Sequence, residues 1–170
     1  MIMEQYDSSV NGLMNFLDAS VCNFFAVDTL SQILVEEGFV YLDPKKRWEL
    51  VSGGKYFITK NDSALFAFIV GEGTASDGYK IISAHSDSPG FRIKPNCEIV
   101  CDGNIVKLNT EVYGGPILYT WFDRPLSIAG RVIVRGTNPL APETLLVKWD
   151  EPLLTIPHLA IHFNLSLIHI

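Results

Sequence analysis

The first forty residues carry the spacing of amphipathic helices. Apolar side chains recur every three or four positions at Val10, Leu13, Met14 and Leu17. A second set with the same spacing ends before Gly38 and contains Phe24, Phe25, Val27, Leu30, Ile33 and Leu34. Such spacing places apolar side chains on one face of a helix, and glycine is favoured just beyond a helix C-terminus. The pattern predicts two helices that lay apolar stripes on a sheet.

The pattern changes to that of strands after residue 54. Two runs rich in aromatic and β-branched residues, KYFITK (55–60) and ALFAFIVG (64–71), flank Asn-Asp-Ser, which is typical of a hairpin connection. The next run, GYKIISAH (78–85), has a continuous apolar centre, as expected of a strand covered on both faces. We therefore predict a central strand over 78–85. His85 would lie at its carboxyl end, the edge at which open α/β sheets usually build their sites.

From residue 91 to 155 the apolar pattern consists of short β-type runs separated by glycine, proline and asparagine. The chain is therefore predicted to hold an α/β domain, with helices on a mixed sheet, over residues 1–90, and a β-rich unit over 91–164. The last six residues, 165–170, read LSLIHI. This is also the in-frame translation of a transposon-end adapter used in sequencing libraries, so we expect these six residues to be non-native.

Composition and charge exclude several classes of function. Apolar residues make up 48% of the chain and charged residues 19%, which supports a substantial core and argues against disorder. A formal net charge of −6 without a lysine–arginine cluster excludes nucleic acid as an expected partner. No apolar run approaches the ~18 residues of a membrane span, and the N-terminus lacks a signal-peptide pattern. We therefore expect a cytoplasmic protein with no membrane partner.

Three cysteines, Cys22, Cys97 and Cys101, give an odd count without a Cys-x-x-Cys pair. Cys97 and Cys101 stand four residues apart, but a zinc site built on them needs a second pair that the sequence does not offer. We expect buried, reduced thiols.

The stretch SAHSDSPGF (83–91) holds His85 and Asp87 two positions apart. In an extended segment, residues i and i+2 project to the same face. The carboxylate of Asp87 can then orient the His85 imidazole while the ring binds a metal. The same residues also fit a polar turn before Pro-Gly. On the residues alone both interpretations stay open.

A catalytic zinc generally needs three protein ligands, so His85 cannot hold one alone. His158 and His162 would share one face of a helix begun by Pro157, as paired zinc ligands do. Leu159 stands where a zincin-type protease needs glutamate, and the alternative is a pair of histidines on a partly buried segment. The aromatic run ILYTWFDRP (117–125) fits either a recognition surface or a strand packed in a core or interface.

Four segments, in order along the chain, resemble the M18 aminopeptidases, the aspartyl aminopeptidase group. SAHSDSPGFRIKP (83–95) resembles the family's A-H-[ST]-D-S-P…R-[IV]-K-P motif, and residues 48–71 resemble the strand pair before it. Residues 111–132 are similar to its Y-G-G…W-x-D-R-x-L-x-x-A-G-R block, and IPHLAIHFN (156–164) to its H-L-A-I-H segment. The resemblance covers residues 8–164.

The resemblance implies a zinc aminopeptidase that removes the N-terminal residue of peptide substrates, with two zinc ions at each active site. His85 matches a zinc ligand, and Asp87 matches the catalytic carboxylate that orients it. His162 matches a substrate-binding residue that reaches a neighbouring subunit's site, which displaces the metal-pair hypothesis for His158 and His162. Residues from about 91 onward match the start of an inserted β-rich domain used for dimerisation and for a dodecamer.

The chain also departs from the family pattern. The family's remaining ligands (two aspartates, a glutamate and a distal histidine) and its glutamate base come from a C-terminal part that has no counterpart here. We therefore expect residues 1–170 alone to show no peptidase activity and no tight stoichiometric zinc binding. Phe25 stands where the family often has histidine.

Two alternatives remain open. One is a related His-x-Asp metallohydrolase of M42 or M20 type, although those families lack the block seen at 113–124. The other is a stand-alone, non-enzymatic module for binding or assembly that uses its β-rich part as the interface.

Overall fold

A computed structural model describes residues 2–73, 75–101, 103, 105–138, 140–160 and 162. The chain divides into two compact units, each made of two stretches of sequence. The first unit holds the residues up to Asp87 together with Ala129–Val147. The second holds Ser88–Ile128 and the described residues from Lys148 onward. The His85–Asp87 pair is thus the last part of the first stretch of the first unit.

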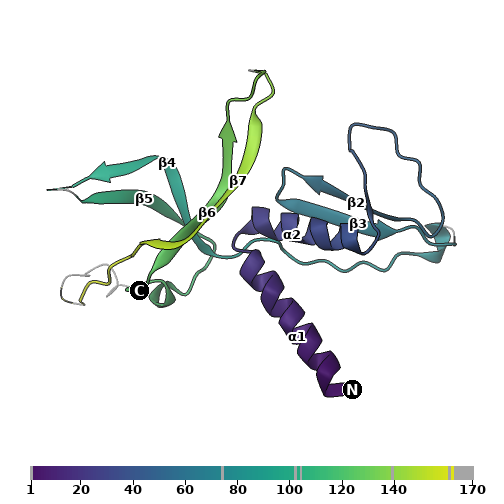
Figure 1. The fold of residues 1–170 in the computed structure, drawn as a ribbon, viewed down its shortest axis with the longest axis horizontal. Coiled ribbons are helices and arrows are strands. Elements are labelled where there is room, and N and C mark those ends of the chain that lie inside the picture. The colour runs from purple at the N-terminus through teal and green to yellow at the C-terminus, as the bar shows by residue number, and fades with distance from the viewer. Residues whose placement is uncertain are drawn as a thin grey trace. The chain divides into compact units, whose positions relative to one another are not determined.

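Two helices open the first unit, as the sequence predicted: α1 (Ile2–Ala19) and α2 (Asn23–Glu36). α2 contacts all three strands of the neighbouring sheet (Figure 1). The expectation that α1 also lies on a sheet is wrong, because its stripe of Val10, Leu13, Met14 and Leu17 is 52–57% exposed. Strands lie about 4.8 Å apart and a helix is about 10 Å wide, so a three-stranded sheet has room for one helix.

The sheet of the first unit has the strand order β1-β2-β3. β1 (Val40–Tyr41) runs parallel to β2 (Lys55–Lys60), and β2 is antiparallel to β3 (Ala64–Ile69), which confirms the predicted hairpin. The buried apolar residues of the described chain gather between this sheet and α2: Ala26, Val27, Leu42, Tyr56 and Phe57. This small cluster is the core of the first unit.

The chain enters the sheet through the predicted glycine after α2. Gly38 has φ +80°, and its backbone N–H donates to the Val35 carbonyl at 3.0 Å. Phe39 N–H donates to the Leu34 carbonyl at 2.8 Å, so two carbonyls of the last turn are paired.

We expect Gly38→Ala to lower the free energy of unfolding of the first unit by about 1–2 kcal/mol, because a Cβ is strained in the left-handed region. Gly12 is the matched control, since it lies inside α1 and a Cβ added there would meet nothing within 4 Å. Gly12→Ala is expected to raise the same quantity by up to ~1 kcal/mol. Urea unfolding followed by circular dichroism measures both, and an unchanged free energy of unfolding in Gly38→Ala would contradict the turn geometry.

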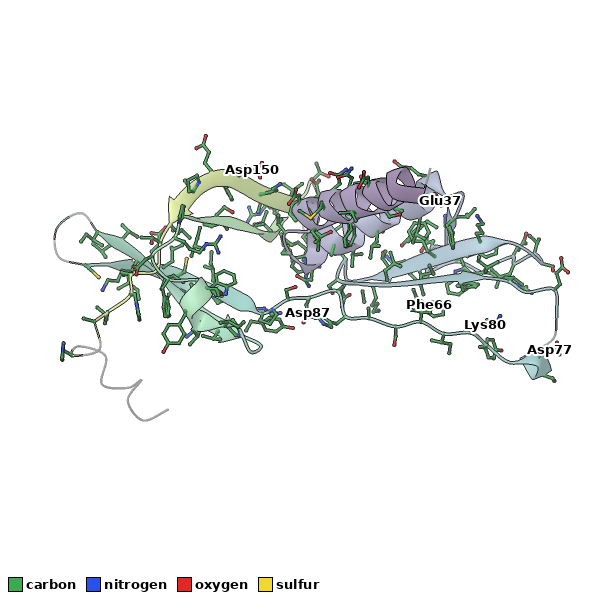
Figure 2. The ribbon with its side chains drawn as sticks, turned by 90° about the horizontal axis from the view of Figure 1, so that it is seen from below. Glu37, Phe66, Asp77, Lys80, Asp87 and Asp150 are labelled. Atoms are coloured by element: carbon green, nitrogen blue, oxygen red, sulfur yellow. The ribbon has the colours of Figure 1, made fainter. Side chains whose placement is uncertain are left out.

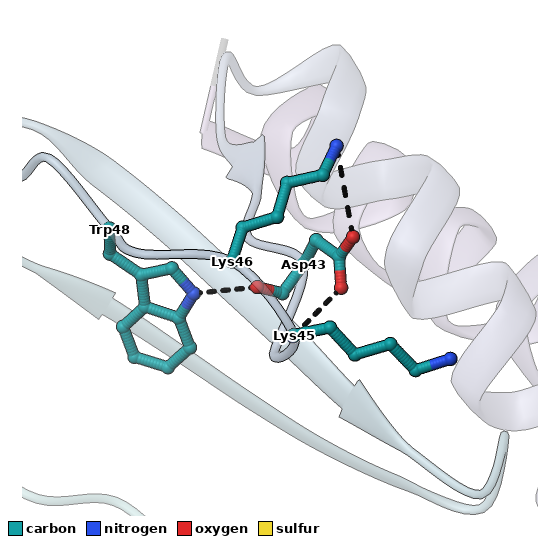
Figure 3. A network of polar contacts seen from close by, with 4 residues as sticks. All are labelled: Asp43, Lys45, Lys46 and Trp48. Atoms are coloured by element: carbon teal, nitrogen blue, oxygen red, sulfur yellow. Dashed lines mark hydrogen bonds and ion pairs between the residues drawn. The ribbon is translucent and has the colours of Figure 1, made fainter.

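A turn at Asp43 connects β1 to β2 (Figure 3). The Asp43 carboxylate accepts a hydrogen bond from the Lys45 backbone N–H at 2.9 Å and lies 3.8 Å from the Lys46 ammonium. Its backbone carbonyl accepts from the Trp48 indole at 2.8 Å. An aspartate that bonds the backbone two residues on is a common turn device, and it fixes the start of this connection.

The described residues of the β-rich part form four strands. β4 (Gly90–Val100) and β5 (Val106–Tyr113) form an antiparallel pair with an irregularity between Ile93 and Glu98. β6 (Leu126–Val134) and β7 (Glu143–Leu154) form a separate two-stranded sheet. The described part of 91–155 holds strands and one short 3₁₀ turn, η2 (Leu118–Thr120), in agreement with the β-type pattern.

The strand interpretation of the aromatic run and the expected burial of the cysteines are wrong. The aromatic run 117–125 forms no strand and instead holds η2 and a turn. The three cysteines are free, as expected, but each is half-buried rather than buried. In the part of the chain that the structure describes, no helix is long and apolar enough to cross a membrane. The suspected non-native residues 165–170 lie outside the described residues.

Candidate metal centre

An extended segment leads to the His85–Asp87 pair. It follows η1 (Ala75–Asp77), passes Lys80 and reaches Asp87 (Figure 2). The prediction of a central strand over 78–85 is wrong, because none of the described strands pairs with this segment. Ile81 and Ile82 are 80% and 99% exposed. Apolar composition alone does not make a strand, since a strand exists only where a neighbour satisfies its backbone groups.

The structure brings His85 and Asp87 together. His85 Nδ1 lies 2.7 Å from the Asp87 backbone carbonyl oxygen and 3.2 Å from Asp87 Oδ1. A carbonyl oxygen only accepts hydrogen bonds, so Nδ1 is the donor and carries the proton. In the neutral ring Nε2 then holds the lone pair. The His85 side chain is 79% exposed, so Nε2 is accessible.

This arrangement has the chemistry of a metal-ligating histidine. Such a histidine usually donates its second ring N–H to a carbonyl or carboxylate, which fixes the tautomer and the direction of the ring. The residues therefore fit zinc at one ligand position. Among the described residues no group of three or more histidine, cysteine, aspartate or glutamate side chains could hold a metal ion. The geometry of His85 thus suits one ligand position, and a complete zinc site would need further ligands.

Ser86 projects to the other side of the segment. Its hydroxyl donates to the Ser63 backbone carbonyl at 2.8 Å, in the turn between β2 and β3. This is the alternation expected of an extended chain, with His85 and Asp87 on one side and Ser86 on the other. The sequence analysis assigned no role to Ser86. The only sequence feature that could have indicated one is its position between His85 and Asp87.

His158 packs against aromatic rings in the second unit. Its imidazole stacks on Phe122 with centroids 5.1 Å apart and meets the edge of Tyr119 at 5.9 Å. Its backbone N–H donates to Asp123 Oδ1 at 2.9 Å. Residues 157–160 form no helix, so the shared helical face expected for His158 and His162 does not exist there. His162 is exposed, and its role stays a prediction.

Asp123 is a residue that sequence reasoning missed. Its φ of +52° places it in the left-handed region, and its backbone N–H donates to the Ile156 carbonyl at 2.9 Å. Together with the bond to His158 it fixes the chain at 156–158 to the turn after η2. An aspartate before Arg-Pro is a turn signal that could have indicated this.

A histidine–aspartate pair of this geometry, at the end of the first stretch of an α/β unit, is compatible with a metal-dependent enzyme. Comparison with known families then identifies the chain. Residues 16–168 match the family described as "Aminopeptidase I zinc metalloprotease (M18)". The chain belongs to the M18 family of aminopeptidases.

Relatives and solved structures agree with this assignment. The chain is 56% identical over 153 residues to "Probable M18 family aminopeptidase 2" of Clostridium acetobutylicum, which covers 89% of this chain and 35% of that protein. It is 40% identical to "Aspartyl aminopeptidase" of Dictyostelium discoideum, covering 96% and 34%. The structure of the Ape4 and Nbr1 complex matches with a TM-score of 0.86 and 37% identity, covering 96% and 31%. The S. cerevisiae mApe1 dodecamer matches with 0.83 and 26%, covering 93% and 37%.

The chain spans about a third of the length of the relatives that it matches, 35% and 34% for the two named above. The activity, substrates and partners of those whole proteins are therefore treated as proposals for this chain.

Proposed function

We propose that the protein carrying this sequence is a zinc aminopeptidase that removes the N-terminal residue of peptides, with two zinc ions at each active site. The observation that carries the proposal is the contact of His85 Nδ1 with the Asp87 carbonyl at 2.7 Å, which leaves Nε2 available to a metal. Membership of a zinc metalloprotease family and the names of the relatives support it.

In this proposal His85 holds one zinc ion through Nε2, and Asp87 orients the ring through Nδ1. Zinc, when bound, polarises the peptide carbonyl and lowers the pKa of a bound water. Asp87 can orient the ring because its Oδ1 lies 3.2 Å from His85 Nδ1. The other ligands and the general base come from residues outside the described part of the chain.

We further infer that the β-rich residues 91–164 begin an inserted domain for dimerisation, and that His162 binds substrate at a neighbouring subunit's site. The exposure of His162 is compatible with such a role. β4 and β5 form a sheet of two strands, so each has an edge available for pairing. One matching structure is described as a dodecamer. We also propose that the protein is located in the cytoplasm.

The experiment compares the 170-residue chain with a joined protein. The joined protein carries residues 1–162 of this chain, followed by the part of the C. acetobutylicum relative that comes after its matching segment. At 56% identity the two parts are expected to fold together. We expect the joined protein to bind zinc and to release N-terminal residues from peptides. The chain alone is expected to do neither, since it supplies one ligand where a catalytic site needs three.

Two results would overturn parts of the proposal, the first its peptidase activity and the second its assignment of the other ligands to residues outside the described part of the chain. A folded joined protein that binds zinc but releases no N-terminal residue from any peptide of a mixed set would favour a binding or assembly module. Zinc-dependent release by the 170-residue chain alone would show that the site is complete within it.

A further inference from the structure

The segment 85–87 is tied to the rest of the first unit through the residue between the two site side chains. Ser86 and Ser63 are both half-buried, and the Ser86 hydroxyl donates to the Ser63 carbonyl at 2.8 Å. The His85 ring contact reaches from residue i to the backbone carbonyl of residue i+2. The His85–Asp87 contact depends on the backbone angles at Ser86. The hydrogen bond from Ser86 to Ser63 therefore also favours the backbone conformation in which Nδ1 is bonded and Nε2 faces solvent.

The turn that receives Ser86 is itself fixed from a distant part of the chain. Arg131 on β6 donates through Nη1 to the Asn61 carbonyl at 2.6 Å and lies 3.4 Å from Asp62 Oδ2. Asn61 and Asp62 have φ of +52° and +55°, which are tolerated by these residue types but costly enough to need outside support. The carbonyl that Arg131 binds belongs to one of these two left-handed residues.

Arg131 is in turn held in place by α2. Its guanidinium lies over the Phe24 ring, 4.4 Å from the ring centroid, and its side chain is 26% exposed. A planar guanidinium can stack on a ring and still donate in its own plane. The contacts thus run from Phe24 through Arg131 to the turn at 61–63, and from there to Ser86.

We propose that Ser86 and Arg131 are positioning residues for the metal-ligand segment 85–87. Ser86 fixes the backbone beside His85, and Arg131 fixes the turn to which Ser86 is bound. The contacts of both side chains given above are with other residues of the first unit, and both residues act through the direction of the His85 ring. The inference rests on the proposed function for its purpose, while the contacts that carry it lie within this chain.

The test uses the 170-residue chain itself and reads the tautomer of His85 by long-range nitrogen–proton NMR in mildly alkaline buffer. The unaltered chain is expected to show the Nδ1–H form as the majority. Ser86→Ala is expected to shift the population toward Nε2–H, since the tautomer follows the hydrogen bond that the ring makes. Ser86→Thr keeps the hydroxyl and is expected to restore the Nδ1–H majority.

Two controls separate positioning from general loss of structure. Ser31 also donates to a backbone carbonyl, at 2.7 Å to Val27, and is also half-buried. Lys55 also donates to a carbonyl, at 3.1 Å to Glu37, and lies over a phenylalanine ring, at 5.5 Å from Phe39. Ser31→Ala and Lys55→Ala are expected to leave the His85 tautomer unchanged, whereas Arg131→Ala is expected to shift it as Ser86→Ala does. An unchanged tautomer in folded Ser86→Ala overturns the inference.

A second readout separates this inference from the proposed function. In the joined protein we expect Ser86→Ala to lower kcat/KM by about tenfold, mainly through kcat, as for loss of an outer-shell partner of a metal ligand. If the unaltered joined protein is inactive while the tautomer shifts as expected, the proposed function fails and the positioning role stands. If the joined protein is active and Ser86→Ala changes neither tautomer nor kcat, the positioning role fails alone.

Discussion

Replacing His85 by alanine in the joined protein is expected to lower kcat/KM by more than about a hundredfold. Removing a partner that only orients a metal ligand already costs about 10–100-fold, and His85→Ala removes the ligand itself. The zinc bound per protein chain is expected to fall as well. Peptide-release kinetics and metal analysis of the purified protein measure both quantities.

Two variants define what this result means. Asp87→Asn keeps the shape of the side chain and the backbone carbonyl that accepts from Nδ1, so a smaller loss of about 10–100-fold is expected. His158→Ala is the matched histidine control, because its ring stacks on Phe122 in the second unit. It is expected to retain zinc and most of the activity. Full activity in His85→Ala would remove His85 from the site.

Replacing Phe57 by alanine is expected to lower the free energy of unfolding of the first unit by about 3–5 kcal/mol. Phe57 is 3% exposed and meets the edge of the Tyr41 ring at 5.4 Å. The described core holds few other buried side chains, so little packing remains to fill the space. A domain is stable by only about 5–15 kcal/mol, and the variant is therefore expected to lie close to the threshold of folding.

Phe66 provides the matched control on the next strand. It pairs in register with Ile58 on β2 and is 58% exposed. Phe66→Ala is expected to change the free energy of unfolding by no more than about 0.5 kcal/mol, as for most surface positions. Urea titrations of both variants give the comparison. Equal losses at Phe57 and Phe66 would mean that the core is not the cluster between α2 and the sheet.

The parts of the fold that the sequence predicted correctly depend on neighbours close along the chain. Spacing of three to four residues was enough for α1 and α2. The two β-type runs that flank Asn61–Ser63 were enough for the β2–β3 hairpin. The glycine after α2 was also predicted, because a helix end is a local event. The contact between His85 and Asp87 could be predicted for the same reason, since the two residues lie only two positions apart.

The parts that the sequence did not predict depend on distant neighbours. The run 78–85 has the composition of a buried strand, but a strand needs a partner and none of the described strands pairs with it. The stripe on α1 indicated a packing face without indicating what covers it. Arg131 carried no signal in the sequence, because its role comes from a contact with Asn61, a residue 70 positions earlier.

That contact also has a consequence for the order in which the first unit assembles. Joining Arg131 to Asn61 closes a loop of 70 residues, and the entropy of closing such a loop must be overcome before the contact contributes any stability. The bond between Ser86 and Ser63 closes a loop of 23 residues and can form earlier. The segment 85–87 is therefore expected to bind first to a turn at 61–63 that Arg131 does not yet hold. The segment becomes fully rigid only after Arg131 on β6 has bound the Asn61 carbonyl.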